Sequence, residues 1–364
     1  MLRTHPVLAW TVAIVASLLV AATLLPFAVT NEWWIRVFDF PRAQIAAALA
    51  IALVAVVLLI GWRRRGALPL IVGLAICLGY QALRILPYTP IYPVEAVRVA
   101  SCPPGNQLRV MVANVLQTNR NSAGLLRLVA QTDPDVLLLV ETDAWWASAV
   151  SPLQARYPHR LADARGNTYG MMLFSRLPLV RPELRYLIED DIPSVRAGIR
   201  LRSGAEVAFF GLHPRPPVPG VDTAQRDAEL VLVGREVKRE ARPALVAGDM
   251  NDVAWSDTSR LFKEVGGLLD PRVGRGLYPT FPAALPLLRW PLDHVFFNDK
   301  LALLGFNRLP DFDSDHLAIR TDLCLAPALA PLQQEPEMEA GDRNRAIETI
   351  REGKEEERED TRQG

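Results

Sequence analysis

Six short polar motifs between residues 107 and 320 carry the side chains of this chain that are best suited to chemistry. Five of them stand at or just past the end of an apolar, β-branched run that predicts a buried strand, and the sixth stands just before one. Carboxylates, carboxamides and imidazoles are costly in a core and are expected at the rim of a site. Their repetition along one chain indicates one convergent pocket. The motif residues are Asn114, Glu141, His213, Asp249, Asn251, Asp293, Asp315 and His316.

Two of these residues have the chemistry of metal-site residues. Glu141 follows the run DVLLLV, and a carboxylate at the end of so apolar a strand needs a cation or several N–H donors. Asn114 ends the run VMVAN, where its carboxamide could hold a water of the metal or a phosphate oxygen. Hard oxygen ligands favour Mg²⁺ or Mn²⁺, with water and substrate phosphate completing the shell. Taken singly, Glu141 could instead cap a helix and Asn114 could form a turn.

The motif GDMN places Asp249 and Asn251 at the end of another apolar run. Their spacing of two residues projects both side chains toward one side, and Gly248 lets the backbone approach a ligand closely. An aspartate in this position can act as a general base or acid, and the asparagine can hold a phosphate oxygen. An Asx-turn is the alternative for the same residues.

The histidines of the motifs suit the stabilisation of negative charge. His316 follows Asp315, and Asp293 precedes His294. A histidine that a carboxylate holds in place can stay protonated and stabilise the charge on a pentavalent phosphorus. His213 begins a proline-rich loop that could clamp a phosphate. Histidines of this kind are more often structural when they occur alone.

Other catalytic arrangements do not occur in the sequence. It has no Cys/His cluster with zinc spacing, no GK[ST] phosphate loop and no G-x-S-x-G serine-hydrolase motif. What remains is a set of acidic and neutral polar strand ends around a hard metal, which predicts phosphate-ester hydrolysis.

The N-terminal quarter of the chain predicts a membrane anchor. The 364 residues carry 40 Lys+Arg and 40 Asp+Glu, so the net charge of +0 gives no overall basic field for nucleic acid. Residues 7–29, 43–62 and 66–83 contain no charged residue and no histidine. Each is close to the roughly 20 residues that cross a bilayer core as a helix. Three spanning helices are therefore expected rather than one cleaved signal peptide.

The charges of the short loops predict the orientation of these spans. Arg63, Arg64 and Arg65 lie between the second and third spans, and Arg3 precedes the first. The positive-inside rule places these arginines in the cytoplasm, so everything after Leu86 lies on the outer side. We therefore expect a multi-pass protein of the cytoplasmic membrane with an extracytoplasmic domain.

Composition divides the chain into four parts. Residues 1–86 form the anchor, and the proline-rich residues 87–106 predict an extended linker. Residues 107–326 alternate strand and helix patterns and form the predicted catalytic domain. Residues 327–364 are highly charged with few large apolar side chains, which predicts a disordered, solvated tail, with a frayed helix as the alternative. Cys102 and Cys324 flank the domain; an oxidising compartment permits their pairing, and two free thiols are the alternative.

The pattern of elements predicts an α+β fold with a layered α/β/β/α arrangement. Short connections between neighbouring strands, such as Ser203-Gly204, indicate hairpins and hence mixed sheets. The predicted strands are 108–115, 135–141, 170–175, 195–201, 205–213, 243–249, 292–298 and 315–322. The predicted helices are 122–132 with Ser122 as cap, 143–155, 222–240, and 256–265 with Ser256 or Asp257 as cap.

Residues 107–324 resemble the endonuclease/exonuclease/phosphatase superfamily, whose members include DNase I-like nucleases, neutral sphingomyelinases and inositol polyphosphate 5-phosphatases. GDMN and SDH occur in this order, with the N, E, H and D motifs before and between them. The resemblance implies a DNase I-like four-layer sandwich and a metal-dependent phosphoric ester hydrolase. It implies Glu141 as the main Mg²⁺ ligand, with Asn114 beside it and Asp315 by the metal.

The same resemblance implies roles for the remaining motif residues. Asp249 would position or deprotonate the attacking water, while Asn251 would bind the phosphate and His213 would contact it. His316 would stabilise the scissile phosphate, oriented by Asp293.

Departures from the family pattern argue against DNA as substrate. Leu116 and Gln117 stand where several nucleases carry an acidic residue, and His294 stands where many relatives have an aromatic one. With its three spans the chain is similar to the membrane-anchored, VanJ-type branch, which implies a lipid bilayer and an isoprenoid or phospholipid phosphate as partners. An extracytoplasmic nuclease and a catalytically silent tethered binding module are the alternatives. No protein partner is inferred.

Overall fold

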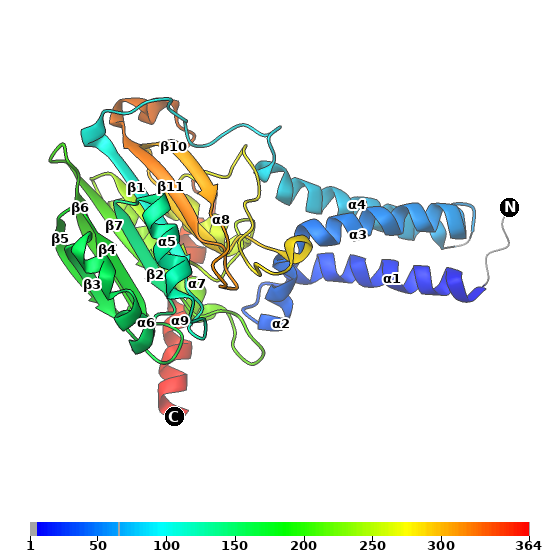
Figure 1. Cartoon of the computed structure of the whole chain (residues 1–364). Coiled ribbons are helices and arrows are strands. Elements are labelled where there is room, and N and C mark those ends of the chain that lie inside the picture. Colours follow the sequence, from blue (N-terminus) through cyan, green and yellow to red (C-terminus); the bar gives the residue numbers. More distant parts are fainter. Residues whose placement is uncertain (1–5, 65, 364) are drawn as a thin grey trace.

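The chain folds into a bundle of three long helices joined to a two-sheet sandwich (Figure 1). The computed structural model describes residues 6–64 and 66–363. The bundle contains α1 (Pro6–Leu24), α3 (Arg42–Ala55), which a π-helical turn extends to Ile60, and α4 (Ala67–Ile85). A short helix, α2 (Trp33–Arg36), lies between α1 and α3.

Among the described residues, three helices are long and apolar enough to cross a membrane: Pro6–Phe27, Arg42–Ile60 and Ala67–Tyr88. These segments agree with the predicted spans to within a few residues. Large apolar side chains such as Trp10, Ile51 and Ile76 are exposed on the bundle. So much exposed apolar surface is unfavourable in water and typical of a membrane-embedded bundle. The turn between α3 and α4 lies at the end of the bundle far from the sandwich (Figure 1).

Within the described part of the chain, two mixed sheets form the sandwich. The first has the strand order β10-β11-β1-β2-β4-β3, and β1 and β2 are parallel. Its strands are β1 (Gln107–Asn114), β2 (Val136–Val140), β3 (His159–Asp163), β4 (Met171–Ser175), β10 (Leu301–Arg308) and β11 (Ile319–Leu325). The second has the order β5-β6-β7-β8-β9, and β7 and β8 are parallel. Its strands are β5 (Leu179–Arg185), β6 (Ser194–Arg200), β7 (Glu206–Leu212), β8 (Ala244–Asp249) and β9 (Asp293–Phe297).

Helices cover the outer face of each sheet, so the predicted α/β/β/α order is confirmed. On the first sheet, α5 (Ser122–Thr132) and α6 (Ala144–Ala149) lie over a core that includes Met111. On the second, α7 (Ala224–Arg239) and α8 (Asp257–Gly266) lie over a core that includes Phe210. A third core fills the space between the sheets.

Alternation along β1 explains why its sequence is apolar throughout. Val110 and Val112 point into the core between the sheets, whereas Met111 and Ala113 point toward α5. Successive side chains of a strand face opposite sides, so a strand that is buried on both faces shows no polar alternation. Asn114 ends this run and is the first buried polar residue after it, at the edge of the sheet.

Most predicted elements are present, with differences that have physical causes. α5 has the predicted bounds, but its cap is Asn121, whose side chain accepts a hydrogen bond from the Gly124 N–H; Ser256 caps α8 as predicted. The predicted strand 315–322 begins only at Ile319, since the preceding residues form the site loop. Strands β3, β5 and β10 lay outside the predicted set because polar or exposed residues interrupt their apolar patterns.

The predicted linker, residues 87–106, is extended but packs against the domain. The Glu95 carboxylate accepts hydrogen bonds from the Lys263 ammonium at 2.7 and 2.9 Å, and the Val99 N–H donates to the Leu303 carbonyl. Cys102 and Cys324 form a disulfide, which joins this segment to β11. Of the two possibilities for these cysteines, the structure contains the paired one.

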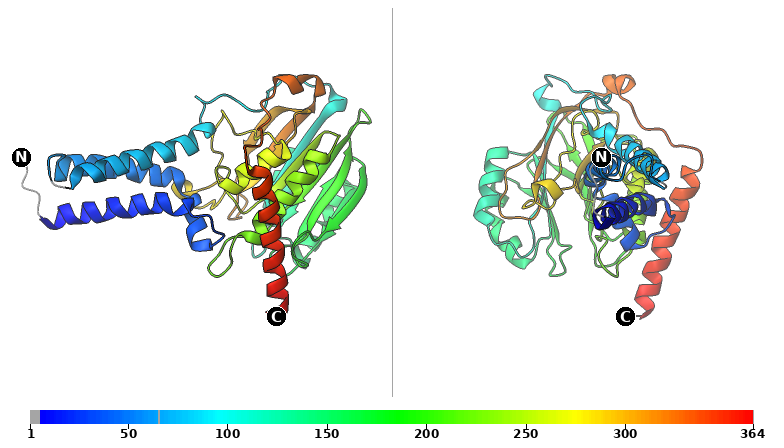
Figure 2. Two further views of the ribbon diagram at one scale, coloured as in Figure 1. Left: turned by 180° about the vertical axis from the view of Figure 1, so that it is seen from behind. Right: turned by 90° about the vertical axis from the view of Figure 1, so that its right-hand side faces the viewer.

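The prediction of a disordered tail is wrong for most of its length. Residues Asp342–Gln363 form helix α9, which lies across the helices of the second sheet (Figure 2). Ala346 and Ile350, four residues apart on one face, pack against Val231 and Leu261. Two apolar residues on one face are enough to dock a helix when they pack against the apolar surface of other helices. The composition of the segment does not reveal such a surface.

The disulfide has a direct chemical test. Alkylation of the unfolded, non-reduced protein should modify one of the three cysteines, Cys77, because Cys102 and Cys324 are bonded to each other. Reduction before alkylation should raise the count to three. Intact-mass spectrometry reads both numbers, and three adducts without reduction would contradict the bond.

The docking of α9 can be tested by truncating a buried side chain. Replacing Ile350 by Ala should lower the free energy of unfolding by about 2 kcal/mol, because it removes buried methyl groups from the contact with α7 and α8. The matched control is Ile347→Ala, since Ile347 is on the same helix but 52% exposed. Thermal unfolding of the full chain in detergent measures both. Equal losses in the two variants would mean that α9 does not pack as described.

Candidate active site

All of the motif residues come together at one edge of the sandwich. The parallel pairs β1/β2 and β7/β8 end at this edge, and their ends carry Asn114, Glu141, His213 and Asp249. β9 runs antiparallel to β8, with Asp249 opposite Asp293. The expectation that Asp293 ends an apolar strand is therefore wrong: it begins β9, and the antiparallel register brings it to the same edge.

The segment before β11 completes this edge. β11 runs antiparallel to β1, with Ile319 opposite Val112, so the residues that precede β11 lie beside the end of β1. The Ser314 hydroxyl donates to the Asn114 carbonyl at 2.8 Å and fixes the SDH turn there. Asp315 and His316 thus reach the site from the start of a strand.

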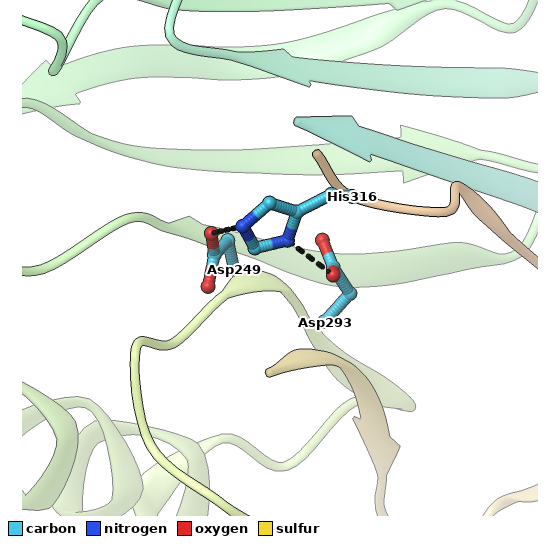
Figure 3. A group of neighbouring side chains, drawn as sticks. All are labelled: Asp249, Asp293 and His316. Atoms are coloured by element: carbon cyan, nitrogen blue, oxygen red, sulfur yellow. Dashed lines mark hydrogen bonds and ion pairs between the residues drawn. The ribbon is translucent and has the colours of Figure 1, made fainter. Parts of the chain in front are cut away.

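His316 lies between two buried carboxylates (Figure 3). Its Nδ1 is 2.8 Å from Oδ2 of Asp293, and its Nε2 is 3.5 Å from Oδ2 of Asp249. Burial by itself would lower the pKa of His316, but the charges of Asp293 and Asp249 outweigh it and raise the pKa to about 10. The imidazole is therefore a cation at neutral pH, in the position that the sequence predicted for charge stabilisation.

Asn114 connects Asp249 to Glu141. Its Nδ2 donates to Oε1 of Glu141 at 2.8 Å and to Oδ2 of Asp249 at 3.0 Å, and its Oδ1 accepts from the Leu116 N–H. The Gln117 N–H donates to the second oxygen of Glu141 at 3.1 Å. Asn114 thus holds two carboxylates next to each other. Both of its side-chain polar atoms are used in these contacts, so it would position the ligands of the predicted metal.

The acidic groups around Asn114 are short of positive charge. Burial raises the pKa of Glu141, and so does the charge of Asp249. Burial also raises the pKa of Asp315, with further contributions from Glu141 and Asp249. Oδ1 of Asp315 is buried without a hydrogen-bond partner among the described residues. A cation would satisfy this oxygen and relieve the repulsion.

The donor set fits a hard divalent metal. Ligand atoms of Asp249, Asp293 and His316 lie within 4.8 Å of one another, which makes a metal conceivable there. A protonated His316 already supplies the positive charge of that group, however, and a protonated nitrogen cannot bind a metal. Oδ1 of Asp315 has no partner within the described part of the chain, and burial together with the charge of Asp249 raises the pKa of Glu141, so the metal is better placed on their side of Asp249, where carboxylates suit Mg²⁺ or Mn²⁺.

Asn251 and His213 lie on the other side of Asp249. The Asn251 N–H donates to Oδ1 of Asp249 at 3.0 Å, and its Nδ2 donates to the Pro214 carbonyl at 2.9 Å. Nε2 of His213 lies 3.9 Å from Oδ2 of Asp249. Burial lowers the pKa of His213 to about 4, so its imidazole is neutral at pH 7. It can donate a hydrogen bond to a phosphate but not a charge.

A second layer, which sequence reasoning missed, supports the GDMND loop. The His294 Nε2 donates to the Asp252 carbonyl at 2.9 Å, while its Nδ1 faces the Arg272 guanidinium at 2.5 Å. Arg272 is in turn paired with the buried Asp270. The signal was present in the sequence, because His294 departs from the aromatic residue expected after Asp293; its partner 22 residues earlier could not be found from spacing.

The loop after Asp249 also contacts the helical bundle and the segments next to it. The loop that follows Asp249 continues to Trp255, whose indole N–H donates to the Asp39 carbonyl at 2.8 Å. The Tyr88 hydroxyl donates to the Ala254 carbonyl at 2.6 Å, from the end of the third span. The loop that carries Asp249 is therefore packed directly on the helical bundle.

Comparison with known proteins gives one family match. The model of the Endonuclease/Exonuclease/phosphatase family matches residues 111–316, a range that begins in β1 and ends at His316. Among curated proteins, none matches the sequence.

Solved structures with a similar fold cover the sandwich. A TDP2 of D. rerio, humanised by 14 mutations, is 16% identical with a TM-score of 0.50, and the match covers 60% of this chain and 98% of that one. An endonuclease/exonuclease/phosphatase from Bacteroides vulgatus is 17% identical with a TM-score of 0.50, covering 60% and 99%. One from Beutenbergia cavernae is 21% identical with a TM-score of 0.49, covering 61% and 72%. At such identities the likeness concerns the fold.

The charge of His316 leads to a prediction about pH. Its pKa in the folded protein, about 10, lies above the ordinary 6.5, so its ion pairs stabilise the fold fully below pH 6.5 and lose this effect as pH rises through 10. Asp293→Asn should lower the pKa of His316 and reduce the free energy of unfolding near pH 7 by about 3 kcal/mol.

Ring-proton NMR and thermal unfolding of the metal-free protein measure these two effects. The exposed Asp313, changed to Asn in the same loop region, is the matched control and should leave both quantities unchanged. If His316 titrates near 6.5 in the unmodified protein, the two carboxylates do not control its charge.

Proposed function

Because the chain belongs to the endonuclease/exonuclease/phosphatase family, a family of hydrolases, we propose that it is a membrane-anchored, divalent-metal-dependent phosphoesterase. Its substrate is a phosphate ester, in the first place a lipid-linked one such as an isoprenoid or phospholipid phosphate. It acts on the outer face of the cytoplasmic membrane, in the manner of the VanJ-type branch that the sequence resembles.

The observation that carries this proposal is the surroundings of Asp249. Oδ2 of this carboxylate accepts from the Asn114 amide and faces both His316 and His213, and Oδ1 accepts from the Asn251 N–H. Residues of three other predicted motifs thus meet around the carboxylate of the GDMN motif. These groups supply a candidate general base, phosphate-binding donors and a cation at one point, which are the parts that phosphate-ester hydrolysis needs.

Mg²⁺ or Mn²⁺ would be held by Glu141 and Asp315, with Asn114 beside them. When bound, the ion would neutralise the charge of the phosphate and polarise its ester. This assignment rests on Oδ1 of Asp315, unpartnered among the residues that the structure describes, and on the mutual repulsion of the two carboxylates.

The chain's own residues then perform hydrolysis. Asp249 orients a water molecule and accepts its proton, while the water oxygen forms a bond to phosphorus and the ester P–O bond breaks. Asn251 and the neutral His213 hold phosphate oxygens by hydrogen bonds. The His316 cation, fixed by Asp293, stabilises the negative charge that grows on the phosphoryl group. The leaving oxygen takes up a proton from solvent.

Two observations favour a lipid over a nucleic acid. The site loop packs on the helical bundle through Trp255 and Ala254, so the site lies near the bilayer that such a bundle requires. A tether of this kind raises the effective concentration of the site toward lipid headgroups. The net charge of +0 provides no electrostatic attraction for a polyanion.

The test uses the full chain in proteoliposomes or detergent. Hydrolysis of an isoprenoid monophosphate, bis-p-nitrophenyl phosphate and plasmid DNA is measured with Mg²⁺ and with EDTA, and Asp249→Asn serves as the inactive control. We expect EDTA-sensitive release of phosphate from the lipid with DNA left intact. EDTA-sensitive DNA cleavage instead would make the protein an anchored nuclease, and silence on every substrate would favour a tethered binding module.

The metal assignment predicts different behaviour for two variants. Glu141→Gln should raise the Mg²⁺ concentration needed for half-maximal activity by about tenfold or more, because it removes a charged ligand. His316→Ala should lower turnover by roughly 100-fold or more with metal affinity largely retained, since His316 acts on the phosphate. Activation titrations with Mg²⁺ measure both constants. Equal metal affinities in the two variants would contradict the role of Glu141.

A further inference from the structure

A loop between β8 and β9 connects the candidate site to the anchor, and we call residues 280–291 the leucine loop. At its first end, the Phe281 ring lies 4.7 Å from the His316 ring, and the Ala283 N–H donates to the Asp315 carbonyl at 2.7 Å. At its other end, two residues on, is Asp293 itself. The leucine loop therefore forms one wall of the site.

The tip of the leucine loop exposes three large apolar side chains. Leu285 is 52% exposed, Leu287 87% and Leu288 48%. The loop is ordered, since Phe281 and Trp290 pair as an antiparallel bridge at its base. The Leu288 N–H donates to the Leu285 carbonyl at 2.9 Å within the tip. Backbone hydrogen bonds thus hold the three leucines in an exposed position, although leucine is among the residues most often buried in folded proteins.

The tip lies beside a candidate membrane span. The Gln44 side chain, in the first turn of α3, donates to the Leu287 carbonyl at 2.9 Å. The Trp290 indole N–H lies 3.4 Å from Oε1 of the same Gln44, and its ring meets that of Phe40 edge to face. Figures 1 and 2 show the short helix of the tip, Pro286–Leu288, next to the end of α3 that is nearer the sandwich.

We propose that Leu285, Leu287 and Leu288 enter the outer-leaflet interface of the bilayer that surrounds the anchor. The edge of the sandwich that carries the site is thereby held on the lipid surface. A phosphate ester with a long apolar chain then reaches His316 along the leucine loop while its chain stays in the bilayer. The membrane contact stands on the loop and the spans alone, and the route for the substrate rests on the proposed function.

The bilayer fits the leucine loop better than other occupants do. Its position is fixed by Gln44 at the point where the second span begins, so any bilayer around that span reaches the tip. Trp290 and Phe40 lie at this same level, where aromatic side chains are typical of the lipid–water boundary. A soluble partner would have to bind apolar leucines within the space that lipid headgroups occupy.

The membrane contact can be measured without any enzymatic activity. In a Cys77→Ser background of the full chain, Leu287→Cys carries an environment-sensitive fluorophore, and the protein is placed in phosphatidylcholine vesicles that contain brominated lipid. We expect quenching by the brominated lipid and protection from aqueous iodide. The matched control is a label at Leu332→Cys, which is similarly exposed at 67% but lies in the C-terminal segment, and which should show the reverse.

Either of two results would overturn the membrane contact. A Leu287 label that iodide quenches and brominated lipid does not would place the tip in water. A label shielded from both quenchers would mean that a protein, such as a second copy of the chain, covers the tip.

The substrate route has its own test. The triple variant Leu285→Ser, Leu287→Ser and Leu288→Ser should lower hydrolysis of a long-chain isoprenoid phosphate in vesicles by about tenfold or more, since it removes three apolar contacts with the bilayer. Hydrolysis of bis-p-nitrophenyl phosphate should stay within about twofold, because the variant leaves the catalytic residues untouched. A control that replaces Leu332, Met338 and Ile347 by Ser removes as many exposed apolar residues elsewhere and should change neither rate.

The results separate this inference from the proposed function. Equal losses on both substrates would mean that the variant disturbs the site, and an unchanged lipid rate would remove the route along the loop. Lipid quenching at Leu287 together with hydrolysis of DNA alone would leave the membrane contact standing and reject the lipid phosphoesterase.

Discussion

A single cation between two buried carboxylates is the interaction on which the rest of the site depends. His316 comes from the segment before β11, Asp293 begins β9, and Asp249 ends β8. Each of these groups alone would be costly to bury, and together they offset one another's charge. Their meeting requires that both sheets present their polar ends at the same edge. The α/β/β/α architecture meets this requirement, and it thereby brings the His316 imidazole between the carboxylates of Asp249 and Asp293.

The sequence predicted the parts of the site that stand at the ends of apolar runs. Asn114 and Asp249 could be found because a fully buried strand ends in a polar residue only where something must contact it. The three helices that are long and apolar enough to cross a membrane followed from length and charge alone. Asp293 was identified as a site residue, but the expectation that it follows an apolar run is wrong: it begins β9, and only the antiparallel pairing with β8 brings it to the same edge as Asp249. Register and direction are properties of pairing, which lies outside a single segment.

Other features could not be predicted because they depend on a partner surface. β5 contains Pro182 and shows little alternation of apolar and polar residues, so its sequence resembles a loop. It is a strand because it pairs with β6. α9 has the composition of a disordered segment, and it is helical because α7 and α8 offer an apolar surface to Ala346 and Ile350. The buried contacts of His294 with Arg272, 22 positions earlier, and through it with Asp270 arise from the fold alone. Long-range contacts of this kind have no local pattern.

The disulfide adds a consequence for the membrane insertion that we propose. Cys102 and Cys324 close a loop with a sequence separation of 222 residues, and a bond across so long a loop removes about 5 kcal/mol of entropy from the unfolded chain. The bond forms in an oxidising compartment and stays open in a reducing one. Two copies with the same sequence but opposite orientation would therefore differ in their free energy of unfolding. The difference would be comparable to the total free energy of unfolding of a small domain. For the membrane-anchored protein that we propose, the fold itself would distinguish the two sides of the membrane, and a copy inserted backwards would be the one more readily unfolded and degraded.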